Sequence, residues 1–146
     1  MTETDIALLV HEYEYPLADL RPPLTRLGFR NQRARSCGEA RYFLGSPRPP
    51  ALVFTDTDLP DGNWTDTVAF ARRARPPVSV IVVSRIVDVR LYLDAMEGGA
   101  TEFIVPPFRE ADLDYVVRSA AMTAARRNSD VARGRAAAAR TPLSAP

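Results

Sequence analysis

Three side chains suited to metal or phosphoryl chemistry stand at the ends of short apolar runs. Glu12 and Asp56 each come after such a run, and Ser84 ends a third one. Two carboxylates brought together repel each other, and a hard divalent cation such as Mg²⁺ with oxygen ligands relieves that repulsion. A carboxylate, a metal ion and a hydroxyl are the parts needed to accept a phosphoryl group on aspartate. The alternative is that all three are ordinary polar residues where strands leave a core.

The composition excludes several other kinds of chemistry. All 19 cationic side chains are Arg, so no lysine-dependent mechanism is available. The chain has one His, His11, and one Cys, Cys37, which excludes a zinc site of several His or Cys ligands and an internal disulfide. There is no apolar run of 18 residues and no basic signal-peptide start, so we expect a soluble, cytoplasmic protein without a membrane partner.

The apolar runs predict buried strands. They are five to seven residues long and rich in β-branched side chains, and continuous apolar runs are typical of parallel strands covered on both faces. These strands are 6–10, 51–55 and 78–84, and a fourth is predicted at 101–105. The segment 29–35 (FRNQRAR) occupies the place of a strand but is polar, so it belongs at the edge of the sheet.

Segments of helical length separate the strands. Residues 16–27 have leucines at helical spacing, but Pro22 and Pro23 fall among them, so this helix is expected to be kinked or to start late. The other predicted helices are 38–44, 65–74, 88–97 and 110–126. A β-α alternation repeated five times predicts an α/β fold with a five-stranded parallel sheet and helices on both faces. Function is then expected at the carboxyl ends of the strands.

The charge is distributed unevenly along the chain. Residues 126–146 carry five Arg and one acid, whereas the remaining residues carry 14 Arg and 17 acids. We therefore predict a folded domain over 1–125 and a disordered tail rich in Arg, Ala and Pro over 126–146. Basic residues are not concentrated on a folded motif, so nucleic acid is not expected as a partner.

The sequence resembles the receiver domains of response regulators over about residues 5–124. The most specific element is the acceptor block, in which Leu59-Pro60 follows three residues after Asp56. The segments that carry the resemblance are 9–12 (LVHE), 28–29 and 36–40 (GF, SCGEA), 52–61 (LVFTDTDLPD), 80–84 (VIVVS) and 99–108 (GATEFIVPPF). It implies a single flavodoxin-like domain with the strand order 2-1-3-4-5.

The resemblance also implies roles for individual residues. Asp56 would be the phosphoacceptor, Ser84 would bind a phosphoryl oxygen, and Phe103 would be the switch aromatic. Magnesium would be held weakly by the carboxylates of Glu12 and Asp56 and by the backbone carbonyl of Asp58. The bond before Pro107 would be cis.

Four positions depart from the family pattern. His11 stands in place of the first acid, Pro106 in place of the lysine, Trp64 in place of a glycine and Arg85 in place of a small residue. His11 would be a metal ligand, a pH-sensitive group or simply a residue that has lost its acid. Arg85 would either turn inward to replace the missing cation or point into solvent, and Trp64 would cap the pocket, form a docking surface or pack internally.

The resemblance leaves two functions open, and a third comes from another class of protein. The first is a single-domain response regulator of a phosphorelay, which accepts phosphate from a histidine kinase or phosphotransfer protein. The second is a phosphate-independent pseudo-receiver that only docks on partners, with a homodimer through the fourth helix, fifth strand and fifth helix as one option. A small flavodoxin-like enzyme is disfavoured because no glycine-rich phosphate loop follows the first strand (HEYEYP).

Overall fold

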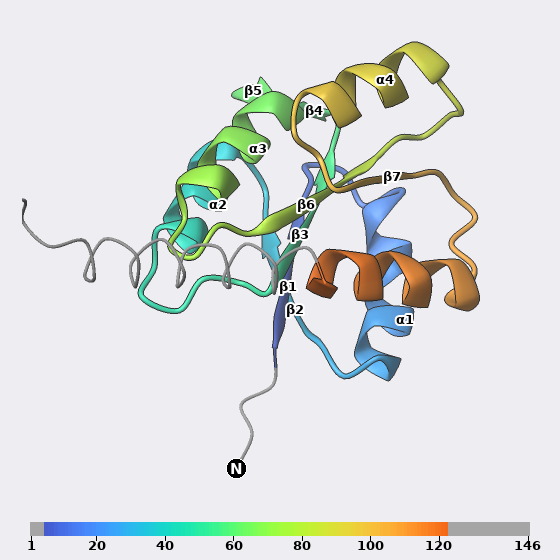
Figure 1. Cartoon of the computed structure of the whole chain (residues 1–146), viewed down its shortest axis with the longest axis horizontal. Coiled ribbons are helices and arrows are strands. Elements are labelled where there is room, and N and C mark those ends of the chain that lie inside the picture. Colours follow the sequence, from blue (N-terminus) through green and yellow to red (C-terminus); the bar gives the residue numbers. More distant parts are fainter. Residues whose placement is uncertain (1–4, 123–146) are drawn as a thin grey trace, which may run out of the picture.

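The computed structural model describes residues 5–122, so the predicted domain boundary and the tail 126–146 lie outside the described residues. One parallel sheet forms the centre of the molecule (Figure 1). Its strands lie in the order β2-β1-β3-β6-β7, which confirms the predicted α/β fold and its order. The strands are β1 (Ile6–Val10), β2 (Arg30–Ala34), β3 (Leu52–Asp56), β6 (Ser79–Val83) and β7 (Glu102–Ile104).

The predicted strands agree closely with the observed ones. β1 has the predicted bounds, and β3 and β6 each differ by one residue at either end. The polar segment forms β2 at the edge of the sheet, as predicted, where it pairs only with β1. A strand at the edge is only partly covered, and β2 is half-buried along most of its length. This explains how a strand with the sequence RNQRA can belong to this sheet.

The register aligns the carboxyl ends of the central strands. Val10 lies opposite Thr55, and Asp56 lies opposite Val83, so the residues that follow β1, β3 and β6 emerge at one edge. Backbone hydrogen bonds extend this edge beyond the strands: His11 donates to the carbonyl of Ala34 at 2.9 Å, and Ser84 donates to that of Ile104 at 3.0 Å. The three sequence-predicted strand ends therefore meet.

Helices cover both faces of the sheet. The helix expected at 16–27 begins with a 3-10 turn, η1 (Leu17–Leu20), and continues as α1 (Arg21–Arg26), because Pro22 and Pro23 fit the first turn of a helix but not its interior. The other helices are α2 (Cys37–Leu44), α3 (Trp64–Arg73), α4 (Val89–Glu97) and a helix that is described over residues 110–122. Within the described residues, no helix is long and apolar enough to cross a membrane.

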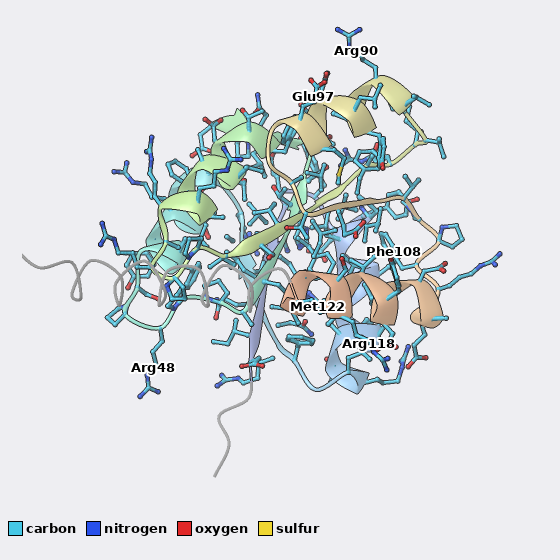
Figure 2. All side chains as sticks on the ribbon, viewed as in Figure 1. Arg48, Arg90, Glu97, Phe108, Arg118 and Met122 are labelled. Atoms are coloured by element: carbon cyan, nitrogen blue, oxygen red, sulfur yellow. The ribbon has the colours of Figure 1, made fainter. Side chains whose placement is uncertain are left out.

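Two apolar layers account for the continuous apolar runs. Leu8, Val10 and Val53 face α2 and α3, whereas Leu9 and Phe54 face α1 and the helix 110–122. Figure 1 shows these helix pairs on opposite sides of the sheet and α4 at its upper end. Side chains fill the space between the sheet and its helices (Figure 2), and those of the core are almost fully buried, so the central strands β1, β3 and β6 have to be apolar along most of their length.

A small antiparallel hairpin between β3 and α3 was not predicted. It consists of β4 (Asp58–Leu59) and β5 (Gly62–Asn63), and its turn carries Asp61. The Asp61 carboxylate accepts hydrogen bonds from the backbone N–H groups of Cys37, at 2.7 Å, and Gly38, at 3.0 Å. These bonds hold the pKa of Asp61 below its ordinary value. Asp61 therefore caps the start of α2, although it lies 24 residues after Cys37 in the sequence.

Replacing Asp61 with Ala should lower the free energy of unfolding by about 1 kcal/mol at neutral pH, because two N–H groups at the start of α2 lose their partner. A lowered carboxyl pKa stabilises the fold above the ordinary value of 3.8, and this contribution is lost as the pH falls through the lowered pKa. Urea denaturation at pH 7 and pH 3 measures both effects. The matched control is Asp58→Ala on the same hairpin, and equal losses in the two variants would contradict the capping role.

Candidate functional site

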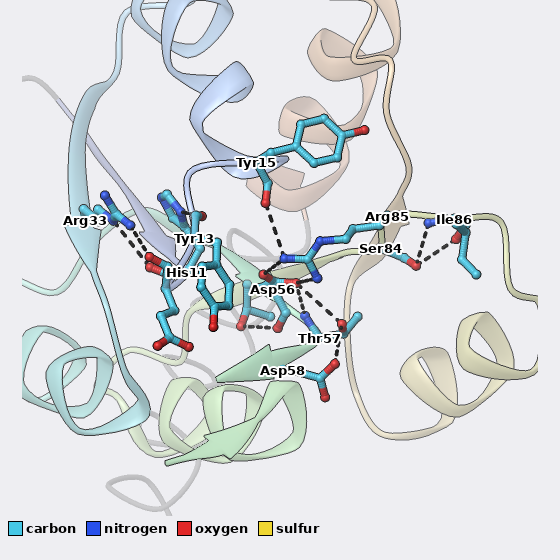
Figure 3. A network of polar contacts seen from close by, with 12 residues as sticks. His11, Tyr13, Tyr15, Arg33, Asp56, Thr57, Asp58, Ser84, Arg85 and Ile86 are labelled. Carbon is cyan, nitrogen blue, oxygen red and sulfur yellow. Dashed lines mark hydrogen bonds and ion pairs between the residues drawn. The ribbon is translucent and has the colours of Figure 1, made fainter. Parts of the chain in front are cut away.

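The carboxylate of Asp56 lies at the end of β3 with only 1% of its surface exposed. Arg85, which lies two residues after the end of β6, binds this carboxylate through both terminal nitrogens of its guanidinium group. Nη2 donates to Oδ2 at 3.1 Å and Nη1 donates to Oδ1 at 3.4 Å. The backbone N–H of Thr57 donates to Oδ1 at 2.8 Å. Figure 3 shows this arrangement. Both oxygens of the expected acceptor are therefore occupied by donors.

Arg85 also joins a third loop to this pair. Its Nη2 donates to the backbone carbonyl of Tyr15, in the β1–η1 loop, at 3.4 Å. Of the two orientations left open by the sequence, Arg85 adopts the inward one. Arg85, which follows β6, therefore connects Asp56 at the end of β3 with Tyr15 in the loop after β1.

Ser84 lies beside this pair, but its hydroxyl group faces another way. The Oγ donates to the backbone carbonyl of Ile86 at 2.7 Å and lies 3.3 Å from the Ile86 N–H, which donates to it. Figure 3 shows the hydroxyl group directed toward Ile86. A role in binding an oxyanion on Asp56 would require this side chain to rotate.

His11 is fully buried at the end of β1. Its Nδ1 lies 2.7 Å from the carbonyl of Tyr13, an oxygen that can only accept, so Nδ1 carries the proton. The Nε2 atom is buried and has no hydrogen-bond partner. Burial lowers the pKa of His11 below its ordinary value, because a charged ring would place an unpaired N–H in the interior. The geometry favours a neutral His11 that holds the loop after β1 through its hydrogen bond to the Tyr13 carbonyl.

Arg33 is a site residue that the sequence analysis missed. It extends from β2 to the end of β1, where it donates to the carbonyls of His11 at 3.4 Å and Glu12 at 2.6 Å. It also forms an ion pair with the carboxylate of Glu14, and this contact lowers the pKa of Glu14. The signal was an arginine in an edge strand, which usually indicates only a solvated face.

The residues expected to hold magnesium do not form a ready site. Glu12 is exposed, Asp56 is held by Arg85, and the side chain of Asp58 is exposed on the hairpin. Within residues 5–122, no three His, Cys, Asp or Glu side chains lie close enough to hold a metal ion. Glu12, Asp56 and the Asp58 carbonyl supply oxygen ligands of the kind Mg²⁺ prefers, but the ion would first have to displace the guanidinium group from Asp56.

The sequence is similar to those of two bacterial regulatory proteins. No family model matches the chain. Over 100 residues, 68% of its length, it is 31% identical to the photosynthetic apparatus regulatory protein RegA of Cereibacter sphaeroides and covers 54% of that protein. It thus spans about half the length of RegA. It is 24% identical to the chemotaxis protein CheY of Thermotoga maritima over 70% of its own length and 85% of that protein.

Solved receiver domains share its fold. A CheY-like response regulator receiver domain from Methanospirillum hungatei superposes with a TM-score of 0.69 at 20% identity, over 88% of this chain and 99% of that one. The receiver domain of an HD domain-containing protein from Pseudomonas fluorescens gives 0.71 at 24% identity, over 85% and 99%. The chain is a CheY-like receiver domain. It belongs with the response regulators of two-component systems.

The remaining departures of this receiver domain lie around the same edge. Pro106 occupies the position of the lysine, and the Pro106–Pro107 bond is cis, as the resemblance implied. Proline brings neither a cation nor a backbone N–H to the pocket. The Phe103 ring is half-buried and meets Tyr92 of α4 edge to face, with 5.7 Å between ring centroids.

Trp64 packs internally. Its half-buried ring lies against a cluster of Val82, Ala95 and Ala100, and a Cβ added at Gly98 would be 3.0 Å from that ring. Of the roles that the sequence left open for Trp64, the structure supports packing between α3 and the end of α4.

Removing Arg85 should leave Asp56 buried without a counter-charge. We expect Arg85→Ala to lower the free energy of unfolding by about 2 kcal/mol, a value reduced because Arg85 is 39% exposed. Asp56→Asn combined with Arg85→Ala should cost less than the sum of the two single changes. Urea denaturation of the four proteins measures this coupling, and strict additivity would contradict a direct interaction.

The buried His11 should make stability depend on pH. A folded pKa below the ordinary 6.5 means that the unfolded chain binds the proton more tightly, so the stabilisation is complete above pH 6.5 and is lost as the pH falls below it. The charges that act on the ring are Arg33 and Arg21, which lower its pKa, and Glu14, which raises it. Denaturation between pH 5.5 and 7.5 should show this slope in the wild type but not in His11→Asn. Equal slopes would refute it.

Proposed function

We propose that this receiver domain signals through protein contacts while Asp56 stays unphosphorylated under ordinary conditions. The observation that carries the proposal is the two-pronged grip of Arg85 on Asp56. Phosphoryl transfer needs one carboxylate oxygen free to attack phosphorus in line with the leaving group. Here both oxygens accept hydrogen bonds, and attack requires Arg85 to withdraw.

The charges available for transfer support the same proposal. A phosphoryl group on Asp56 concentrates negative charge on its oxygens, and preorganised cations and donors are what speed its arrival. Pro106 supplies no donor, and loss of one such donor typically costs about 10²–10³ in rate. Magnesium would bind weakly, because it must compete with Arg85 for Asp56. The protein is then a pseudo-receiver and not a classical enzyme.

One observation favours a second function, in which Asp56 still accepts phosphate. Arg85 is a cation within hydrogen-bonding distance of the acceptor oxygens, and a guanidinium group binds phosphate oxygens well. If Arg85 moved outward to make room for a phosphoryl group on Asp56, it would contact the phosphoryl oxygens and take over the role of the lysine. Ser84 would then have to leave Ile86 to contribute its hydroxyl.

The partners we propose are a histidine kinase or phosphotransfer protein, or a downstream signalling protein, with a homodimer as a further option. The expected face is α4, β7 and the helix 110–122. α4 presents an exposed apolar stripe at spacings of three, four and seven residues, which consists of Val89, Tyr92, Leu93 and Met96. Val89 is 68% and Leu93 51% exposed. Such a stripe on a surface helix is typical of a protein-binding face.

The deciding experiment is labelling with acetyl phosphate or carbamoyl phosphate, with intact-mass detection, with and without magnesium. We expect wild-type protein to gain phosphate slowly or not at all. Arg85→Ala together with Pro106→Lys should gain it much faster, because the acceptor is freed and a cation is restored. Asp56→Asn added to that pair should abolish labelling.

Arg90→Ala is the matched control, because Arg90 is exposed on α4 and pairs with Asp94 and not with the acceptor. It should label as slowly as the wild type. Labelling of the wild type within minutes at ordinary magnesium concentrations would instead establish the second function. In that case Arg85→Ala should slow the reaction, which distinguishes a helpful cation from a blocking one.

A further inference from the structure

We propose that the Arg85–Asp56 ion pair is a latch that fixes the β6–α4 loop against the sheet edge, so that breaking this pair releases the loop and α4 with it. The inference concerns the regulation of the site described above. It rests on the proposed function only in taking α4 as the surface that partners meet.

The packing of α4 makes it sensitive to such a latch. Ala95 is its one buried residue, and the apolar stripe is largely exposed, with Tyr92 alone meeting a ring of β7. At its carboxyl end the helix is held by the ring of Trp64 against Gly98 and by the cluster of Val82, Ala95 and Ala100. Toward its amino end the apolar contacts are weaker, because Ile86, Val87 and Val89 are all exposed and the half-exposed Tyr92 meets Phe103 only edge to face.

The loop of residues 85–88 therefore controls the amino end of α4. Its hydrogen bonds with Ser84 and within the first turn of α4 are local, since Ser84 contacts Ile86 and Asp88 caps Leu91. Within the described part of the chain, the polar contacts that join this loop to the rest of the fold are those of Arg85 with Asp56 and with the Tyr15 carbonyl. The link depends on one side chain.

The Arg85–Asp56 ion pair decides between two states of the β6–α4 loop, a latched one and a released one. With an ionised carboxylate, the guanidinium group is held by two charge-assisted hydrogen bonds in a site from which water is largely excluded. Once the ion pair is broken, as in Asp56→Asn, Arg85 keeps hydrogen bonds only to neutral acceptors such as the Tyr15 carbonyl at 3.4 Å. Because its side chain is already 39% exposed, hydration becomes the better alternative. The two states are a latched loop and a released loop, and they differ in a defined contact.

Hydrogen exchange of the full chain, followed by mass spectrometry, tests the latch without any phosphodonor. Asp56→Asn is nearly isosteric and removes the charge, whereas Arg85→Ala removes the other partner. We expect exchange in residues 85–97 to become at least tenfold faster in each variant. The double variant should exchange no faster than the single ones, because all three lack the same interaction.

Arg90→Ala is the control for α4 itself, since its ion pair with Asp94 lies within the helix and on the surface. It should leave the exchange of residues 85–88 unchanged. Because Trp64 is the sole tryptophan and contacts the end of α4, its fluorescence should shift in Asp56→Asn and not in Arg90→Ala.

The latch is wrong if Asp56→Asn leaves the exchange of residues 85–97 as it is in the wild type. It is equally wrong if exchange accelerates to the same extent in β1, β3 and β6, because the change would then be global and not local. Rapid phosphate labelling of the wild type would overturn the proposed function but not these exchange results. The two proposals therefore fail separately.

Discussion

A carboxylate that is 1% exposed needs a counter-charge, and at Asp56 that charge comes from a single arginine. In the receiver domains that the sequence resembles, a lysine near the end of the fifth strand has this place. Pro106 removes it, and Arg85 supplies a cation from the end of the neighbouring strand β6 instead. The other features of the pocket agree with this substitution: the Ser84 hydroxyl turns toward Ile86, and the Tyr15 carbonyl accepts a further hydrogen bond from Arg85.

At the end of β1, too, an arginine binds backbone or side-chain oxygens at the edge of the sheet. His11 replaces an acid, so one negative charge is lost where magnesium would need it, and its neutral ring is buried beside Tyr13. Arg33 donates hydrogen bonds to the carbonyls of His11 and Glu12. Two arginines thus lie at this edge of the sheet, and Arg85 donates to both of the Asp56 oxygens that a metal ion would use.

The sequence predicted the elements far better than the side-chain directions within the site. Continuous apolar runs located β1, β3 and β6 to within a residue, because both faces of these strands are covered, and the polar composition of β2 placed it at the edge. The Asp61 cap depends on contacts with residues 23 and 24 positions away, which periodicity does not encode. The two strands of the β4–β5 hairpin have two residues each and are too short to show a pattern. Arg85 could face two ways, and Asp56 on β3 and the Tyr15 carbonyl decide between them, whereas the Ser84 hydroxyl is oriented by Ile86 in its own loop.

Exchanging the lysine for Arg85 also changes which element senses the acceptor. A lysine at position 106 would connect a modified aspartate to β7, so coupling would appear after modification. Arg85 connects the unmodified carboxylate to the β6–α4 loop, so the restraint exists while Asp56 is charged and unmodified. Because α4 buries only Ala95 and keeps its apolar stripe exposed, the loop is the element through which the charge on Asp56 can reach a partner-facing surface. In this structure, the charged and unmodified Asp56 carboxylate holds Arg85 and, through it, the β6–α4 loop at the edge of the sheet.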